Sequence, residues 1–239
     1  AISWDGVKGT MSNCTFINTF SSNGGAIHWN GDNGLLSNCT FINTSASGGA
    51  SIYWRGADSL LINCTFINTS SLNSAGAIHF RNSGNAIRDC TFINTSANAN
   101  AGAIELYYVY DSIVNNCTFI NVSSGVRGGA IYWNHPGGTL TNCTFVNVHA
   151  NESGGAIYWN YENGVVSGCT FVNTSAKNLG GAISWNEGNG TVSDCSFTNC
   201  NASVGGAISW ESGAFHWDDS SKGTISNCSF INNSANIGS

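Results

Sequence analysis

The side chains that could carry chemistry in this chain are its ten cysteines, five histidines and thirteen acidic residues. Nine cysteines recur at intervals of 25 to 33 residues: Cys14, Cys39, Cys64, Cys90, Cys117, Cys143, Cys169, Cys195 and Cys228. Such a row does not converge on one point, as a tetrahedral metal site requires. The histidines stand at other positions of the repeat, so no cysteine–histidine nucleophile is predicted. We expect buried free thiols that pack as small apolar groups.

Cys200 alone is out of step with the row. It follows a repeated asparagine, at a position where most other copies have threonine or valine. We expect Cys200 to be exposed and to be the candidate for an intermolecular disulfide.

Acidic side chains follow a recurring tryptophan in several copies, for example Asp5, Asp32 and Asp58. Their offsets from the tryptophan drift, and the seven lysines and arginines are scattered. Acid–base catalysis on sugars needs clustered carboxylates or a basic residue beside them. We therefore expect no enzyme, no catalytic or metal-binding residues and no cofactor.

The cysteine row belongs to a longer repeated phrase. Two places after each of the nine cysteines stands a phenylalanine, and two further on stands an asparagine, as in Cys39, Phe41 and Asn43. Upstream lies a phrase such as GGAIHW at 24–29 or GGAIYW at 128–133. Each copy holds three short apolar stretches separated by Gly, Asn and Ser, which indicates three short strands. A repeat of 25–27 residues with three strands is typical of a parallel β-helix, here with about nine rungs.

Alternation within the phrase predicts which side chains face the core. Cys39 and Phe41 should point inward, whereas Thr40 and Ile42 should point outward. The asparagines then lie at a corner, where an amide can bond its stacked neighbours and tolerate left-handed backbone.

The outward threonines and isoleucines form a candidate interface for lateral contacts, with ordered water or ice as a less favoured target of the same array. Simple suitability of β-branched residues for strands is the other explanation. The candidate interface comprises Thr15, Ile17, Thr40, Ile42, Thr65, Ile67, Thr91, Ile93, Thr118, Ile120, Thr144 and Val146.

Two irregular copies interrupt a single β-helix domain that spans residues 1–239. About eight extra residues at about 213–220 predict a loop, and loops of this kind often bind ligands. Its candidate binding residues are Phe215, His216, Trp217, Asp218 and Asp219. The fifth copy has Tyr107, Tyr108 and Tyr110 in place of a glycine-rich turn, and we expect these aromatics to be exposed.

The GGAI phrase occurs intact at 24–27, 128–131, 154–157, 180–183 and 205–208. With the CTFIN phrase it resembles the GGAI and FxxN repeats of chlamydial polymorphic membrane proteins, and more closely the adhesin-like surface proteins of methanogenic archaea. The resemblance spans the whole chain, although phenylalanine and asparagine are two residues apart here. It implies a right-handed parallel β-helix displayed at or outside the cell surface.

Charged residues make up 8% of the chain and the net charge is −6, without a basic stripe in the sequence. We therefore expect neither nucleic acid nor insertion into a membrane. In an extracellular setting several asparagines begin glycosylation sequons, namely Asn38, Asn43, Asn68, Asn142 and Asn201.

The function that we expect is non-enzymatic: an adhesin segment, or a building block of a surface fibre or sheath. The first and last copies match in phase, which favours either head-to-tail self-assembly or an excised piece of a longer array. Partners would be further copies of the chain, or cell-wall or host glycans. The alternative from another class is a polysaccharide-binding or polysaccharide-cleaving β-helix.

Overall fold

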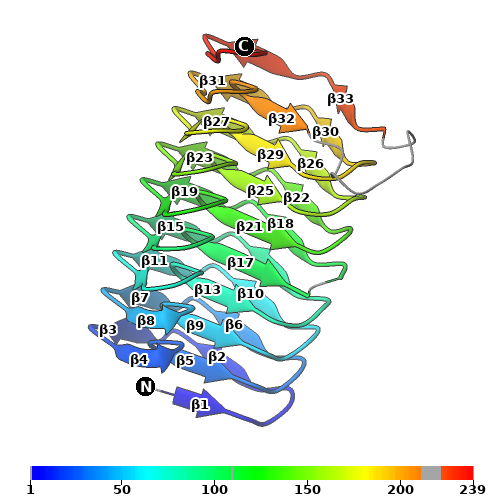
Figure 1. Ribbon diagram of the computed structural model, residues 1–239. Coiled ribbons are helices and arrows are strands. Elements are labelled where there is room, and N and C mark those ends of the chain that lie inside the picture. Colours follow the sequence, from blue (N-terminus) through cyan, green and yellow to red (C-terminus); the bar gives the residue numbers. More distant parts are fainter. Residues whose placement is uncertain (1, 109, 211–221, 239) are drawn as a thin grey trace.

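Each repeat forms one coil whose strands pair in parallel with the same strands of the next coil (Figure 1). The computed structural model describes residues 2–108, 110–210 and 222–238. The predicted β-helix, with its nine rungs, is confirmed. The described residues contain no helix long and apolar enough to cross a membrane.

Three sheets of nine strands run along the rod. Sheet A contains β1 (Ile2–Trp4), β5 (Ile27–Trp29), β9 (Ile52–Trp54), β13 (Ile78–Phe80), β17 (Ile104–Tyr107), β21 (Ile131–Asn134), β25 (Ile157–Trp159), β29 (Ile183–Trp185) and β32 (Ile208–Trp210). Sheet B contains β2 (Thr10–Ser12), β6 (Leu35–Ser37), β10 (Leu60–Ile62), β14 (Ala86–Arg88), β18 (Ile113–Asn115), β22 (Thr139–Thr141), β26 (Val165–Ser167), β30 (Thr191–Ser193) and β33 (Thr224–Ser226). Sheet C contains β3 (Thr15–Ile17), β7 (Thr40–Ile42), β11 (Thr65–Ile67), β15 (Thr91–Ile93), β19 (Thr118–Ile120), β23 (Thr144–Val146), β27 (Thr170–Val172), β31 (Ser196–Thr198) and β34 (Ser229–Ile231).

A fourth sheet, which the sequence did not predict, has seven strands. Sheet D contains β4 (Phe20–Asn23), β8 (Ser45–Gly48), β12 (Ser70–Ser71), β16 (Ser96–Ala97), β20 (Ser123–Ser124), β24 (His149–Ala150) and β28 (Ser175–Ala176). Most of these strands are two residues long and made of serine and alanine. They carry too little hydrophobic alternation to be recognised as strands.

Identical side chains stack along the inside of the rod. The phenylalanines of sheet C are buried in every rung but the last, where Phe230 is exposed, and Phe41 and Phe66 lie 4.7 Å apart between ring centroids at an interplanar angle of 3°. Cys39 is also buried, as predicted, and its backbone N–H donates to Sγ of Cys64 at 3.4 Å. The tryptophans of sheet A stack in the same way, for example Trp159 and Trp185 at 4.8 Å. The core is therefore a bundle of parallel side-chain columns.

A glycine is required where the chain passes beneath a tryptophan ring. A Cβ atom on Gly164 would lie 2.2 Å from Cζ2 of Trp159. Real Cβ atoms do not approach so closely, and the indole ring is locked in its column. This contact explains the glycine that precedes the second strand of the repeat.

The asparagines that end sheet C turn the corner in left-handed conformation, and their amides form a ladder, as predicted. Asn94 has a φ of 53°, its Nδ2 donates to Oδ1 of Asn68 at 3.1 Å, and its Oδ1 accepts from Nδ2 of Asn121 at 3.2 Å. Asparagine tolerates this backbone better than other residues with a side chain. Asparagine at this position therefore allows the left-handed turn and also forms hydrogen bonds through its side-chain amide.

The prediction that Cys200 is exposed is wrong. Cys200 is fully buried, and its Sγ accepts a hydrogen bond from Oγ1 of Thr174 at 3.2 Å. The left-handed Asn199 turns the chain so that the following side chain points inward. Burial raises the pKa of the Cys200 thiol, and an intermolecular disulfide at this position is not accessible in the fold.

We expect Asn94→Ala to destabilise the protein by about 2–4 kcal/mol, because it loses two amide hydrogen bonds and places alanine in left-handed backbone. Asn94→Gly loses the same bonds without the backbone cost, so it should be less destabilised by about 1 kcal/mol. Urea unfolding followed by circular dichroism measures both. Equal stability of the two variants would contradict a left-handed corner.

Candidate functional site

The outward positions of sheet A carry the most varied chemistry of the described surface. In each strand the isoleucine and the large apolar residue two places on, which is Leu106 in β17 and aromatic elsewhere, point inward, so the residue between them faces out. In chain order these outward residues are Ser3, His28, Tyr53, His79, Glu105, Tyr132, Tyr158, Ser184 and Ser209. Cationic and tyrosine side chains lie beside them at Arg55, Arg81, Tyr107 and Arg127. We call His28, Tyr53, Arg55, His79, Arg81, Glu105, Tyr107, Arg127, Tyr132 and Tyr158 the outer stripe.

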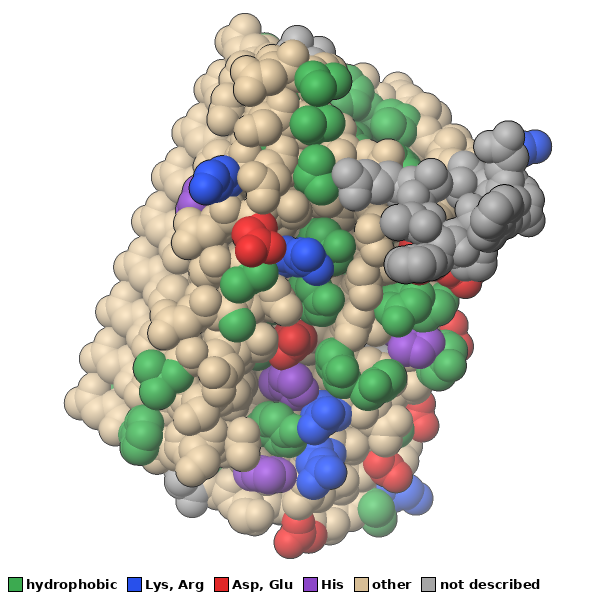
Figure 2. All heavy atoms as spheres, viewed as in Figure 1, with side chains coloured by type: hydrophobic (Ala, Val, Ile, Leu, Met, Phe, Trp, Pro, Cys, Tyr) green, Lys and Arg blue, Asp and Glu red, His purple; other side chains and the backbone are tan. Residues whose placement is uncertain are grey.

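Figure 2 shows how unevenly the charged and histidine side chains are distributed: they gather along the middle of the visible face and along the edge to its right, while the left part is mostly uncharged. Ring stacking orders the first part of the outer stripe. Tyr53 lies 4.9 Å from His79 between centroids, with the rings 5° from parallel, and 5.2 Å from His28 on its other side, where the rings are tilted by 50°. The three rings therefore form a continuous aromatic column.

Glu105 continues this column as a carboxylate. Its Oε2 lies 2.7 Å from Nδ1 of His79, and its side chain is only 7% exposed. Nε2 of His79 is buried and has no hydrogen-bond partner among the described residues. A general base must reach its substrate, so this geometry fits a pair that fixes the imidazole ring better than one that transfers a proton.

Two arginines stand side by side at the end of neighbouring strands. Arg55 and Arg81 follow Trp54 and Phe80, which pair in register, and both arginines are exposed. Arg81 Nη1 donates to the Tyr53 hydroxyl at 2.9 Å, and its guanidinium lies 5.4 Å from the Tyr107 ring centroid. Among the described residues, neither arginine forms an ion pair with a carboxylate. Both cations are therefore available to an anionic ligand.

Farther along the stripe, Tyr132 and Tyr158 stack at 5.4 Å and are almost buried. Arg127 lies over the Tyr158 ring at 5.1 Å and approaches Glu152 to 3.5 Å. Burial, with a smaller contribution from Tyr158, raises the pKa of Tyr132 to about 12. The side chains in this part of the outer stripe therefore contact one another and leave little surface for a ligand.

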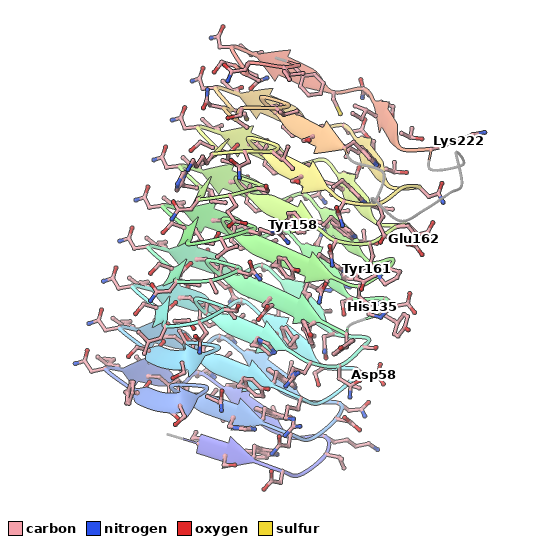
Figure 3. All side chains as sticks on the ribbon, viewed as in Figure 1. Asp58, His135, Tyr158, Tyr161, Glu162 and Lys222 are labelled. Carbon is pink, nitrogen blue, oxygen red and sulfur yellow. The ribbon has the colours of Figure 1, made fainter. Side chains whose placement is uncertain are left out.

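The turn after sheet A forms a second row of polar and aromatic groups. Figure 3 shows Asp58, His135, Tyr161 and Glu162 along one edge of the rod, whereas Tyr158 lies on sheet A. Tyr110 contacts His135 edge to face at 3.8 Å between centroids.

The first acidic side chains of this edge bond the next rung. Asp32 Oδ1 accepts from the backbone N–H of Ala57 at 2.8 Å, and Asp5 Oδ1 accepts from Asn30 Nδ2 at 2.6 Å. No group of three metal-ligating side chains converges within residues 2–108, 110–210 and 222–238. The carboxylates of Asp5 and Asp32 therefore serve rung-to-rung bonding.

The sequence-predicted Thr/Ile residues lie where they were expected, on the outward side of sheet C. Thr40, Thr65 and Thr91 stack in register, and beyond the first rung the row is half-buried. Tyr108 and Tyr110 are exposed and Tyr107 is half-buried. The predicted loop residues Phe215, His216, Trp217, Asp218 and Asp219 lie outside the described residues.

The sequon asparagines lie on the surface, and their modification remains a prediction. All five are exposed. Asn43 Nδ2 donates to Asn18, Asn68 Nδ2 donates to Asn43, and Asn201 Nδ2 donates to Oγ of Ser234. A glycan on any of these three nitrogens would have to coexist with its hydrogen bond.

Sequence reasoning missed most of the outer stripe, namely His28, Tyr53, Arg55, His79, Arg81, Glu105, Arg127, Tyr132 and Tyr158. The signal that could have found it was the alternation within the phrase AIxW, which places residue x outside. Because x changes from histidine to tyrosine, glutamate and serine, no repeated letter drew attention to it.

Fold and surface together define a parallel β-helix repeat protein with one chemically distinct face. The sequence profile of the family described as right-handed β-helix region matches residues 1–130 and 128–238. The chain therefore belongs to this family. A search of the curated proteins found no significant match.

The raised pKa of Tyr132 predicts a pH dependence. A tyrosine that titrates near 10 when unfolded and at about 12 when folded stabilises the fold fully below pH 10, and this contribution is lost as the pH rises to 12. The loss should be at most about 3 kcal/mol. Urea unfolding between pH 9 and 12 should show a steeper decline for the wild type than for Tyr132→Phe. Parallel declines would contradict the burial of this hydroxyl.

Proposed function

We propose that the protein is a non-enzymatic extracellular adhesin segment that binds acidic glycans through the outer stripe. The observation that carries this proposal is the exposed pair Arg55 and Arg81, free of carboxylate partners in the described residues and flanked by the Tyr53 and Tyr107 rings. Guanidinium groups bind carboxylate or sulfate with paired, charge-assisted hydrogen bonds. In a chain with 8% charged residues, such a pair is the strongest anion-recognition element on the described surface.

The rigid β-helix suits this role. Arg55 and Arg81 extend from strands whose backbones are bonded to both neighbouring rungs, for example Arg55 N–H to the Trp29 carbonyl at 2.7 Å and Arg81 N–H to the Trp54 carbonyl at 2.9 Å. A rigid mount lowers the entropy that binding must overcome. Successive rungs also lie one strand spacing apart, so an extended polymer along the rod can contact several of them.

Binding to polygalacturonate and to a sulfated glycan tests the proposal. Arg55→Ala combined with Arg81→Ala should weaken binding at least about 100-fold, because each of the two lost charge-assisted hydrogen bonds contributes about 1.5–3 kcal/mol. Arg88→Ala is the matched control, since Arg88 is an exposed arginine on the outside of sheet B and should change affinity less than about twofold.

Two outcomes would count against this function. Equal weakening by Arg88→Ala would show that binding is unspecific attraction to positive charge. Cleaved oligosaccharides in the binding mixture would show that the protein is an enzyme.

A second candidate function is lateral assembly through the Thr/Ile face of sheet C. Its support is the regular row of half-buried isoleucines, for example Ile67, Ile93 and Ile120, which pair in register over successive rungs. A flat apolar strip of this kind can pack against a copy of itself.

Negative-stain microscopy of the purified protein tests the second function. If lateral bundles form, Ile93→Lys combined with Ile120→Lys should abolish them, because it buries unpaired charges in the contact. Ile62→Lys, on the outside of sheet B, controls for the general effect of an added charge. Monodisperse rods in the wild type would contradict assembly.

A further inference from the structure

The buried cysteine row has a chemistry that the outer stripe does not use. Seven consecutive cysteines, Cys39, Cys64, Cys90, Cys117, Cys143, Cys169 and Cys195, are free and at most 2% exposed. Cys14 and Cys228 continue the row at either end and are half-buried. The row is therefore a column of reduced sulfur atoms inside the β-helix.

The sulfur atoms repeat at the spacing of the rungs. Each cysteine stands two residues before a stacked phenylalanine, and the rings of Phe145, Phe171 and Phe197 follow one another at 4.8 Å. The amide of Cys169 donates to Sγ of Cys195 at 3.4 Å, and the same bond joins Cys143 to Cys169. Neighbouring thiols thus point the same way, about one strand spacing apart.

This spacing matches a two-coordinate ion between two thiolates. A metal–thiolate bond of about 2.3 Å on each side of a linear ion spans about 4.6 Å. Zinc needs four ligands around one centre, which a straight row cannot supply. Soft thiolate ligands select soft cations, and among these the mercuric ion prefers two sulfur ligands in a line.

Charge selects a dication for this buried position. The ion takes two thiolates, each former S–H proton is released to water, and the resulting sulfur–metal–sulfur unit is neutral. A monovalent ion between two thiolates would leave a net negative charge in the core, which is costly.

The last three cysteines of the row lie beside a surface hollow. A cavity of about 320 Å³ is lined by Cys169, Cys195 and Cys228 from three successive rungs, and Asp194 and Asn227 lie at the same place. The exposed Asp194 carboxylate, which accepts a hydrogen bond from Nδ2 of Asn227, attracts cations to this end of the rod. Cys228 is half-buried, so solvent reaches this end thiol more readily than the buried Cys195 of the preceding rung.

We propose that Cys195 and Cys228 bind a linear, two-coordinate, thiophilic dication, with further ions filling adjacent pairs along the row. Nine thiols form at most four separate pairs, so saturation lies at four ions per chain.

Titration of the full chain with Hg²⁺ tests this proposal. The first equivalent should release two protons and show two sulfur neighbours by X-ray absorption, and it should raise the melting temperature because it binds the folded state. Cys195→Ser should weaken the first site by more than the roughly 100-fold that loss of an outer-shell partner costs. Cys200→Ser is the matched control, because Cys200 is equally buried but outside the row. Zn²⁺ should not bind.

The opposite results would overturn the proposal. Release of one proton per ion would indicate simple capping of single thiols, and three or four sulfur neighbours would indicate a converging site. Equal weakening by Cys200→Ser, or a lowered melting temperature of the wild type, would show that the ion acts by disrupting the core. Proton release and sulfur coordination are measured on the wild type. These two measurements therefore test the proposal even if a variant fails to fold.

Discussion

In-register parallel pairing between successive rungs is the interaction on which the rest of the structure depends. It continues through the corners, where the N–H of Asn43 donates to the carbonyl of Ile67 at 3.0 Å. Once the register is set, every residue type must stack on the equivalent residue of the next rung. Identical side chains can stack favourably at this spacing when they are phenylalanine, cysteine or asparagine. This explains why the phrase CTFIN recurs in successive rungs.

The same constraint separates structure from function along each strand. Inward positions carry buried isoleucine and mostly tryptophan, whereas the outward position of sheet A ranges from His28 to Glu105 to Ser184. Outward side chains do not need to match the rung above, so they can change without cost to the core. The stacked rings of Tyr53 and His79, and the arginines beside them that form no ion pair among the described residues, show how such positions can accumulate into a binding surface.

The fold could be read from the sequence because its signals repeat. Nine copies of the Cys–Phe–Asn spacing predict the strands of sheet C, their inward face and the left-handed corner. Sheet D was not predicted because strands such as Ser70–Ser71 have no hydrophobic pattern. Cys200 was misplaced because a left-handed Asn199 reverses the direction expected from simple alternation. The outer stripe was not predicted because its residues share a position in the repeat but no chemical type. Only the register of the folded rungs brings Arg55 beside Arg81.

The proposed role of the outer stripe is tested most directly by nuclear magnetic resonance of the arginine side chains during titration with a uronate oligosaccharide. Arginine Nε–Hε signals report each guanidinium separately, and the chain has few of them. We predict that the signals of Arg55 and Arg81 shift together with the ring signals of Tyr53 and Tyr107, while Arg88 stays unchanged. Shifts of equal size at Arg88, or none at Arg55 and Arg81, would contradict the assignment of glycan binding to this face.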